Sequence, residues 1–153
     1  MAESSAIVVD ANILIRAVFG ERVFELLLKY AKAVRFFAPQ HAFVETEKHI
    51  PRILARRKVP VARIGFRGRT GSAIGDRVRP FVEVIPDQAF FAFKEAALAR
   101  LRRRDPDDWP ILAAALALQC PIWTEDADFF GVGVATWTTE NVGIYLDGFS
   151  ADE

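Results

Sequence analysis

Four acidic residues are the candidates for chemistry in this chain. They are Asp10, Glu45, Asp108 and Asp126, and three of them border apolar runs, where a solvated surface charge has no reason to cluster. An Asp that ends one strand and an Asp just past a second strand meet in one crevice, because parallel α/β sheets gather ligands at the carboxyl ends of their strands. Converging carboxylates repel one another unless a cation lies among them, and all-oxygen ligation suits Mg²⁺ or Mn²⁺ better than zinc. The pattern therefore predicts a metal-dependent phosphoryl-transfer enzyme.

The first two carboxylates also have structural explanations. Asp10 could cap the first helix, although a carboxylate that ends so apolar a strand is costly to bury without a partner. Asn12 serves equally well as a cap or as a site residue. Glu45 could be an exposed helix residue, and Glu47 lies close enough in the sequence to be confused with it.

The last two carboxylates have competitors nearby. Asp108 is a natural N-cap for the helix that follows it, a role that is compatible with metal binding. Asp105 and Asp107 compete with it as ligands, and Asp128 competes with Asp126. The sequence alone leaves these alternatives open.

The composition limits the class of protein. The 153 residues fit a single domain, 1–153, and a content of 52% hydrophobic and 26% charged residues is globular rather than disordered. No apolar run approaches the roughly 20 residues that span a bilayer, and the N-terminus lacks the basic start of a signal peptide, so we expect a cytoplasmic protein with no membrane partner. Cys120 is the only cysteine, which rules out an internal disulfide. His41 and His49 have no Ser or Cys setting that suggests a catalytic triad.

The net charge of zero hides a strong asymmetry along the chain. The segment 48–79 contains ten basic residues and a single acidic one, Asp76, whereas no Lys or Arg follows Arg104. A basic stretch before an acidic one suits a nucleic-acid phosphodiesterase, because cations hold the backbone and carboxylates hold metal. A solvated helix face and loop explains the arginines equally well. The candidates for RNA contact are Arg52, Arg56, Arg57, Arg67 and Arg69.

Short apolar runs alternate with segments of helical period, which predicts a three-layer α/β/α sandwich with a mostly parallel central sheet. The strands are expected at 6–10, 34–38, 81–85 and 121–123, with weaker candidates at 134–137 and 144–146. The helices are expected at 13–19, 23–33, 43–54, 90–104 and 110–118. Asn12 caps the first helix in this scheme, and Pro51 kinks or breaks the third. Residues 59–75, in which glycines and arginines interleave, are expected to form a basic loop or a short helix flanked by loops.

Taken in order, the acidic motifs resemble those of the PIN-domain family, and more narrowly those of VapC-type toxin ribonucleases. The similar segments are Val8-Val9-Asp10-Ala11-Asn12-Ile13-Leu14, Ala38-Pro39 followed by Glu45, Asp108 with residues 111–115, and Trp123-Thr124-Glu125-Asp126-Ala127-Asp128-Phe129. Their order and spacing make the resemblance specific, and it covers nearly the whole chain. The helix start at 108–111 and the tail at 130–139 depart from common VapC sequences.

The resemblance implies a set of site residues and an activity. The acidic ligands of a Mg²⁺ or Mn²⁺ ion would be Asp10, Glu45, Asp108 and Asp126, with Asp128 as an auxiliary ligand and Asn12 and Thr124 as orienting neighbours. The implied protein is a divalent-metal-dependent endoribonuclease, the toxin of a toxin–antitoxin module, with RNA as substrate and a small antitoxin as partner. Apolar residues around 24–28 and 43–54 predict in addition a homodimer.

Other functions compete with this one. The main alternative is a PIN-fold nucleic-acid-binding or RNA-processing protein that is not a toxin, and DNA is also a candidate substrate because PIN homologues include DNA flap nucleases. A non-catalytic binding module is disfavoured because all four acidic positions are present. A phosphatase that forms an aspartyl-phosphate on Asp10 is disfavoured because Asp10-Ala11-Asn12 lacks the second Asp that such an enzyme uses as acid and base.

Overall fold

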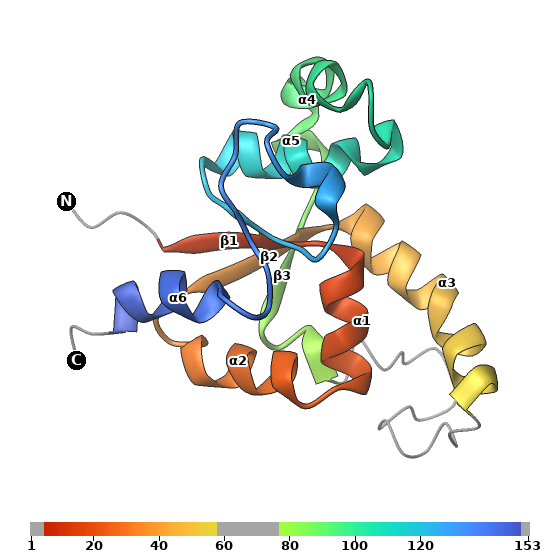
Figure 1. The fold of residues 1–153 in the computed structure, drawn as a ribbon, viewed down its shortest axis with the longest axis vertical. Helices are drawn as coiled ribbons and strands as arrows, with labels where there is room; N and C mark the ends of the chain where they lie inside the picture. Colours follow the sequence, from red (N-terminus) through yellow and green to blue (C-terminus); the bar gives the residue numbers. More distant parts are fainter. Residues whose placement is uncertain (1–4, 58–76, 151–153) are drawn as a thin grey trace.

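A parallel sheet forms the centre of the protein (Figure 1). The computed structural model describes residues 5–57 and 77–150. Within these ranges the strands are β1 (Ala6–Val9), β2 (Arg35–Pro39), β3 (Val82–Ile85), β4 (Ile122–Trp123) and β5 (Thr136–Trp137). Their order across the sheet is β3-β2-β1-β4-β5, and every neighbouring pair is parallel.

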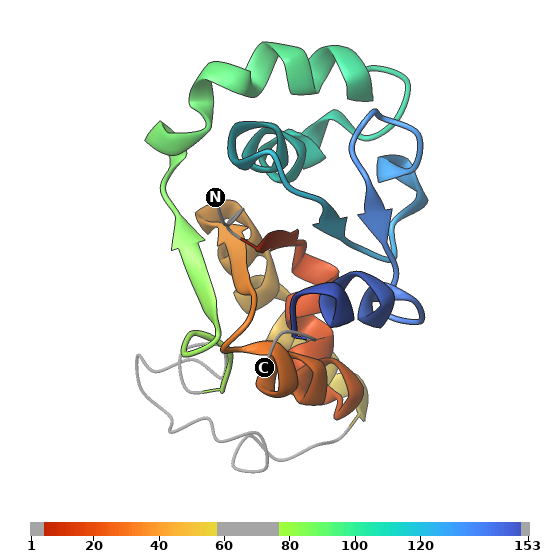
Figure 2. The same cartoon turned by 90° about the vertical axis from the view of Figure 1, so that its left-hand side faces the viewer.

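Helices cover both faces of this sheet, which confirms the predicted three-layer α/β/α sandwich. The α-helices of the described part are α1 (Ala11–Phe19), α2 (Arg22–Tyr30), α3 (Gln40–Arg57), α4 (Lys94–Leu101), α5 (Trp109–Leu118) and α6 (Val142–Ser150). Helix α5 packs on the sheet with α4 above it, whereas α1, α2 and α6 lie on the opposite face (Figure 2). None of the described helices combines the length and the apolarity needed to cross a membrane.

The core explains why two of these elements are apolar throughout. Strand β1 is buried along its whole length because both faces of the sheet are covered. Helix α5 buries residues 110–115, since it lies between the sheet and α4, and its run of alanines lets the backbone approach the strands closely. On the face of the sheet that α6 covers, Trp123 of β4 and Phe36 of β2 are buried together, with ring centroids 6.1 Å apart.

The strand order places a crevice at one end of β1. From β1 the chain adds β2 and β3 on one side, and it then crosses over to add β4 and β5 on the other side. Ligands of open parallel sheets bind beyond the carboxyl ends of the strands where the order reverses in this way. Here these strands are β1 and β4, which are followed directly by Asp10 and Thr124.

Several local predictions are wrong. Residues 144–146 belong to α6 instead of a strand, because Val142 and Leu146 are one helical turn apart and both are buried. The expected helix at 90–104 is divided: residues 91–93 form a 3₁₀ turn, and the α-helix ends at Leu101. Helix α1 is capped by Asp10 and not by Asn12. Pro51 lies inside α3, which runs on to Arg57, so of the predicted kink or break the break is absent.

Much of the apolar surface that predicts a homodimer is used inside the chain. Leu27 and Phe43 are buried in the core. Phe24 packs edge-on against Phe81, with ring centroids 5.7 Å apart. Leu28 stays exposed. The predicted loop at 59–75 lies outside the described residues.

Candidate functional site

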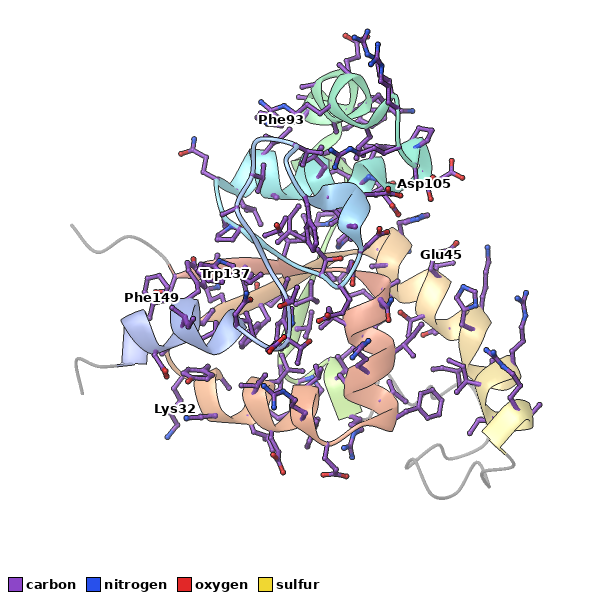
Figure 3. All side chains as sticks on the ribbon, in the orientation of Figure 1. Lys32, Glu45, Phe93, Asp105, Trp137 and Phe149 are labelled. Atoms are coloured by element: carbon purple, nitrogen blue, oxygen red, sulfur yellow. The ribbon has the colours of Figure 1, made fainter. Side chains whose placement is uncertain are left out.

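A cavity of about 1030 Å³ opens at the carboxyl ends of β1 and β4. Its lining comes from the residues that follow these strands, from one side of α3, and from the turn that leads into α5. Figure 3 shows two acidic side chains of its walls, Glu45 on α3 and Asp105 on the turn before α5. The fold therefore brings the predicted acidic motifs to a single cavity.

Asp10 forms part of the cavity floor and also caps α1. Its carboxylate accepts a hydrogen bond from the Ile13 backbone N–H at 3.0 Å and another from the Thr124 hydroxyl. Only 6% of the residue is exposed, and this burial raises the pKa of Asp10 to about 6, with Asp126 and Glu125 adding a smaller repulsion. The capping role and a place in the cavity thus coexist.

Asp108 closes the 3₁₀ turn Pro106–Asp108 at the start of α5. Its side chain makes no capping hydrogen bond, and its Oδ2 atom is buried without a hydrogen-bond partner. Burial raises the pKa of Asp108 to about 7, and the charges of Asp105, Asp126, Asp10 and Asp128 raise it further in that order of size. A buried carboxylate oxygen with no donor, surrounded by other carboxylates, is unfavourable unless a cation binds it.

Asp126 and Asp128 follow β4 on one short turn. The Asp126 carboxylate accepts a hydrogen bond from the Asp128 backbone N–H at 2.9 Å. Thr124 accepts one from the Asp126 N–H at 2.9 Å, so its hydroxyl joins Asp126 to Asp10. One carboxylate oxygen from each of Asp108, Asp126 and Asp128 lies within 4.8 Å of the other two. We call these three residues the carboxylate cluster; it contains both of the competing positions after β4.

Glu45 is separate from the carboxylate cluster. It lines the same cavity from α3, but its oxygens lie 3.6 Å from Lys48 Nζ and 3.9 Å from His49 Nε2. Glu47, its competitor in the sequence, is exposed and does not line the cavity. Asn12 is an exposed residue of the cavity wall.

The predicted RNA-binding arginines differ in where the structure places them. Arg56 lines the cavity at the far end of the α3 wall, and Arg52 is exposed on the same helix. Arg57 is the last residue of α3. Arg67 and Arg69 lie outside the described residues.

Arg104, which no sequence motif singles out, holds the turn that carries Asp128. Its guanidinium donates hydrogen bonds to the backbone carbonyls of Ala127 at 3.4 Å, Asp128 at 2.8 Å and Phe130. Backbone carbonyls leave no side-chain signature, so sequence reasoning had no signal for this contact. Its neighbour Arg100 donates to the Val132 carbonyl at 3.0 Å.

The donor set of the site fits a hard divalent cation. The carboxylate cluster offers only oxygen atoms, and Asp108 Oδ2 has no donor among the described residues. Mg²⁺ and Mn²⁺ prefer such ligands, whereas zinc usually takes His or Cys. The pKa values of Asp10 and Asp108 are both raised chiefly by burial, and the charges of neighbouring carboxylates raise them further.

Comparison with known proteins shows the family of this chain. Residues 8–147 match the family described as PIN domain, a family of nucleases. Among curated proteins none matches the sequence significantly. Two solved structures have a similar fold: VapBC2 from Rickettsia felis bound to a DNA fragment from its promoter (TM-score 0.63, 14% identity, 87% of this chain and 98% of that one) and a toxin–antitoxin complex from Klebsiella pneumoniae (TM-score 0.56, 17% identity, 87% and 97%). Because the match covers most of its length, the chain belongs to the PIN domain family.

Proposed function

We propose that the protein is a divalent-metal-dependent endoribonuclease and the toxin of a toxin–antitoxin module. The observation that carries this proposal is the carboxylate cluster with its unpartnered Asp108 Oδ2, in a chain of the PIN domain family. A carboxylate that only capped a helix would use one oxygen for the backbone and keep the other in water. Asp108 instead has a buried oxygen with no donor in the described part of the chain, close to other carboxylates, as in a cation site.

Asp10 and the carboxylate cluster would hold Mg²⁺ or Mn²⁺, and Glu45 would join them from α3. When bound, such a cation supplies positive charge at the phosphodiester and lowers the pKa of the attacking water. The chain itself orients the ligands, because Thr124 links Asp10 to the Asp126 backbone and Arg104 fixes the turn at Asp128. No side-chain nucleophile is required.

The two ends of the α3 wall have different roles in this proposal. Glu45 lines the cavity from the first part of α3, where its carboxylate can accept a proton from water. Arg56 lies farther along the same wall, where its guanidinium can bind a substrate phosphate. Single-stranded or looped RNA fits this cavity because an unpaired strand can bend towards a recessed acidic floor.

The partner assignment rests on the similar structures, both of which are complexes of a toxin with its antitoxin. We propose that a small antitoxin binds this protein in the cytoplasm and blocks the cavity. A homodimer remains a prediction, with less apolar surface to support it than the sequence suggested, because Leu27 and Phe43 are buried. The alternative is an RNA-processing protein of the same fold that has no antitoxin.

The test is incubation of the purified protein with a pool of structured RNAs in Mg²⁺, Mn²⁺ or EDTA, followed by mapping of the cleaved ends. We expect oligonucleotide products with either metal and none in EDTA, whereas a phosphatase would release inorganic phosphate. Asp108→Asn should lower the rate at least about 100-fold, because it removes a cluster ligand. Asp107→Asn is the matched control, since that neighbouring carboxylate is exposed and lies outside the cluster. Equal cleavage by wild type and Asp108→Asn would show that the site is wrong.

A test of the toxin role is expression in cells with and without the reading frame beside the gene. Growth arrest that depends on Asp108 and is relieved by the neighbouring product is expected. A protein that cleaves RNA in vitro but leaves growth unchanged would favour the RNA-processing alternative.

A further inference from the structure

An aromatic surface with one lysine borders the cavity on the side opposite α3. Trp109 lines the cavity next to Asp108, and Phe91 meets its ring edge-on with centroids 6.2 Å apart. Lys94 Nζ lies 4.9 Å from the centroid of the Trp109 ring and 5.5 Å from that of Phe91. We call Phe91, Lys94 and Trp109 the aromatic rim.

The rim is anchored from beneath and open above. Phe90 is fully buried and packs against Trp109 with ring centroids 5.9 Å apart, which fixes the tryptophan. Phe91 is 57% exposed, although aromatic rings of this size usually contribute to a core. Lys94 makes no ion pair with any described carboxylate, so its ammonium is free to bind an anion.

Charge and position together indicate what would bind there. The cavity floor is acidic and repels phosphate wherever no cation lies, whereas Arg56 on the α3 wall and Lys94 on the rim carry positive charge at its two sides. An RNA strand with one phosphate over the carboxylate cluster would meet a basic side chain on each side, Arg56 in one direction and Lys94 in the other. An exposed ring next to an ammonium suits one nucleotide, because the ring stacks on the base and the ammonium binds the phosphate.

We propose that the aromatic rim is a nucleotide subsite for single-stranded RNA: the Phe91 ring stacks on an unpaired base next to the cleaved bond, and Lys94 binds the phosphate of that nucleotide. Trp109 connects this subsite to the cavity. The assignment rests on the proposed ribonuclease function and adds to it the position and chemistry of base recognition. Stacking accepts any base, so the rim contributes affinity with little sequence preference.

The test compares two short probes in EDTA, where no cleavage is expected and both probes meet the same repulsion from the acidic floor. They are a fluorescently labelled five-nucleotide oligoadenylate and the same ribose-phosphate strand without bases, so the difference between their affinities reports the bases. Wild type should bind the oligoadenylate about 10-fold more tightly, since one stacked base is the difference at this site. Phe91→Ala should remove that difference, and Phe91→Trp should preserve it. Lys94→Gln should weaken the binding of both probes and flatten the salt dependence of that binding.

Phe93→Ala is the matched control. Phe93 (labelled in Figure 3) is on the same 3₁₀ turn and is 38% exposed. Its ring is absent from the aromatic pairs that join the rim. Its removal should leave both affinities unchanged, and melting curves should show that each variant is folded. If Phe91→Ala binds both probes as wild type does, the subsite is wrong.

Cleavage assays on the same variants separate this proposal from the nuclease function. If wild type cleaves RNA and Phe91→Ala has the same cleavage rate and the same probe affinities as wild type, the subsite proposal is overturned and the nuclease function stands. Loss of the oligoadenylate difference in Phe91→Ala, without metal-dependent cleavage by wild type, would support base stacking and overturn the nuclease. If Phe91→Ala disrupts only a complex with the neighbouring gene product, the rim is a protein interface and the subsite proposal fails.

Discussion

Replacement of Asp10 by Asn should make the metal-free protein more stable. The Asp10 carboxylate is buried and carries a pKa raised from 3.8 to about 6, because desolvation outweighs its bonds from Thr124 and Ile13. Asn removes the charge and keeps a carbonyl oxygen for the Ile13 N–H. The variant thus preserves the cap of α1 while it relieves the repulsion among the carboxylates.

The size of this effect follows from the pKa. At about 1.4 kcal/mol for each pH unit, ionised Asp10 costs the fold about 3 kcal/mol above its pKa of about 6. Loss of the hydrogen bond from the Thr124 hydroxyl costs about 1 kcal/mol. The net gain of about 2 kcal/mol corresponds to an increase of about 4–8 °C in melting temperature for a chain of this length.

The pH dependence has a definite sign. The pKa of Asp10 is raised by folding, so the sign is fixed. Below about pH 4 the carboxyl is protonated in the folded and the unfolded chain, and it costs no folding free energy. The full cost is reached once the pH exceeds the folded pKa of about 6. The advantage of Asp10→Asn should therefore be absent near pH 4 and full near pH 8. Saturating Mn²⁺ should reverse the order, since the wild type gains binding free energy that the variant lacks.

The assay is thermal melting of both proteins in EDTA and in Mn²⁺ at several pH values. Asp107→Asn is the control and should melt at the same temperature as the wild type, because Asp107 lines the same cavity but is exposed and lies outside the carboxylate cluster. If Asp10→Asn is less stable than wild type in EDTA at pH 8, Asp10 is chiefly a helix cap and the cost assigned to its charge is wrong.

Three further predictions follow from neighbouring contacts. Mn²⁺ affinity should fall about tenfold for each pH unit below 7, because protons compete for Asp108, whose pKa is raised to about 7; calorimetry at pH 8, 7 and 6 that shows constant affinity would refute this. Arg104→Ala should weaken Mn²⁺ binding about tenfold, because the turn at residues 127–130 loses its donor, whereas the exposed Arg102→Ala should not. Gly133→Ala should lower stability by about 1–3 kcal/mol in urea unfolding, because Gly133 has φ +90°, a backbone conformation that is strained for alanine; an unchanged midpoint would contradict this conformation.

The parts of the fold that the sequence predicts well are those where burial leaves a simple pattern. The apolar run before Asp10 and the Ala-rich run after Asp108 each match a buried element, because a layer covered on both sides tolerates few polar residues. The region 142–150 is different. A three-residue apolar run at 144–146 has no distinguishable period, and its helix depends on packing of Val142 and Leu146 against the rest of the chain.

The candidate site follows the same division. Strand ends point to Asp10 and to the residues after β4, because parallel strands expose their carboxyl ends at one edge. The sequence could not decide between Asp126 and Asp128, since a single turn brings both towards Asp108. It also could not show that Glu45 lies outside the carboxylate cluster, because the position of Glu45 depends on how α3 packs. Nor could it show that Arg104 donates to backbone carbonyls.

The most direct test of the central claim is calorimetric titration of Mn²⁺ into the purified protein at pH 8. We expect a saturable binding event in the wild type that is lost in Asp108→Asn and Asp126→Asn and kept in Asp107→Asn. Such a result would assign the cation to the carboxylate cluster. No binding to the wild type, or equal binding to Asp108→Asn, would contradict the account of this cavity as a metal-dependent nuclease site.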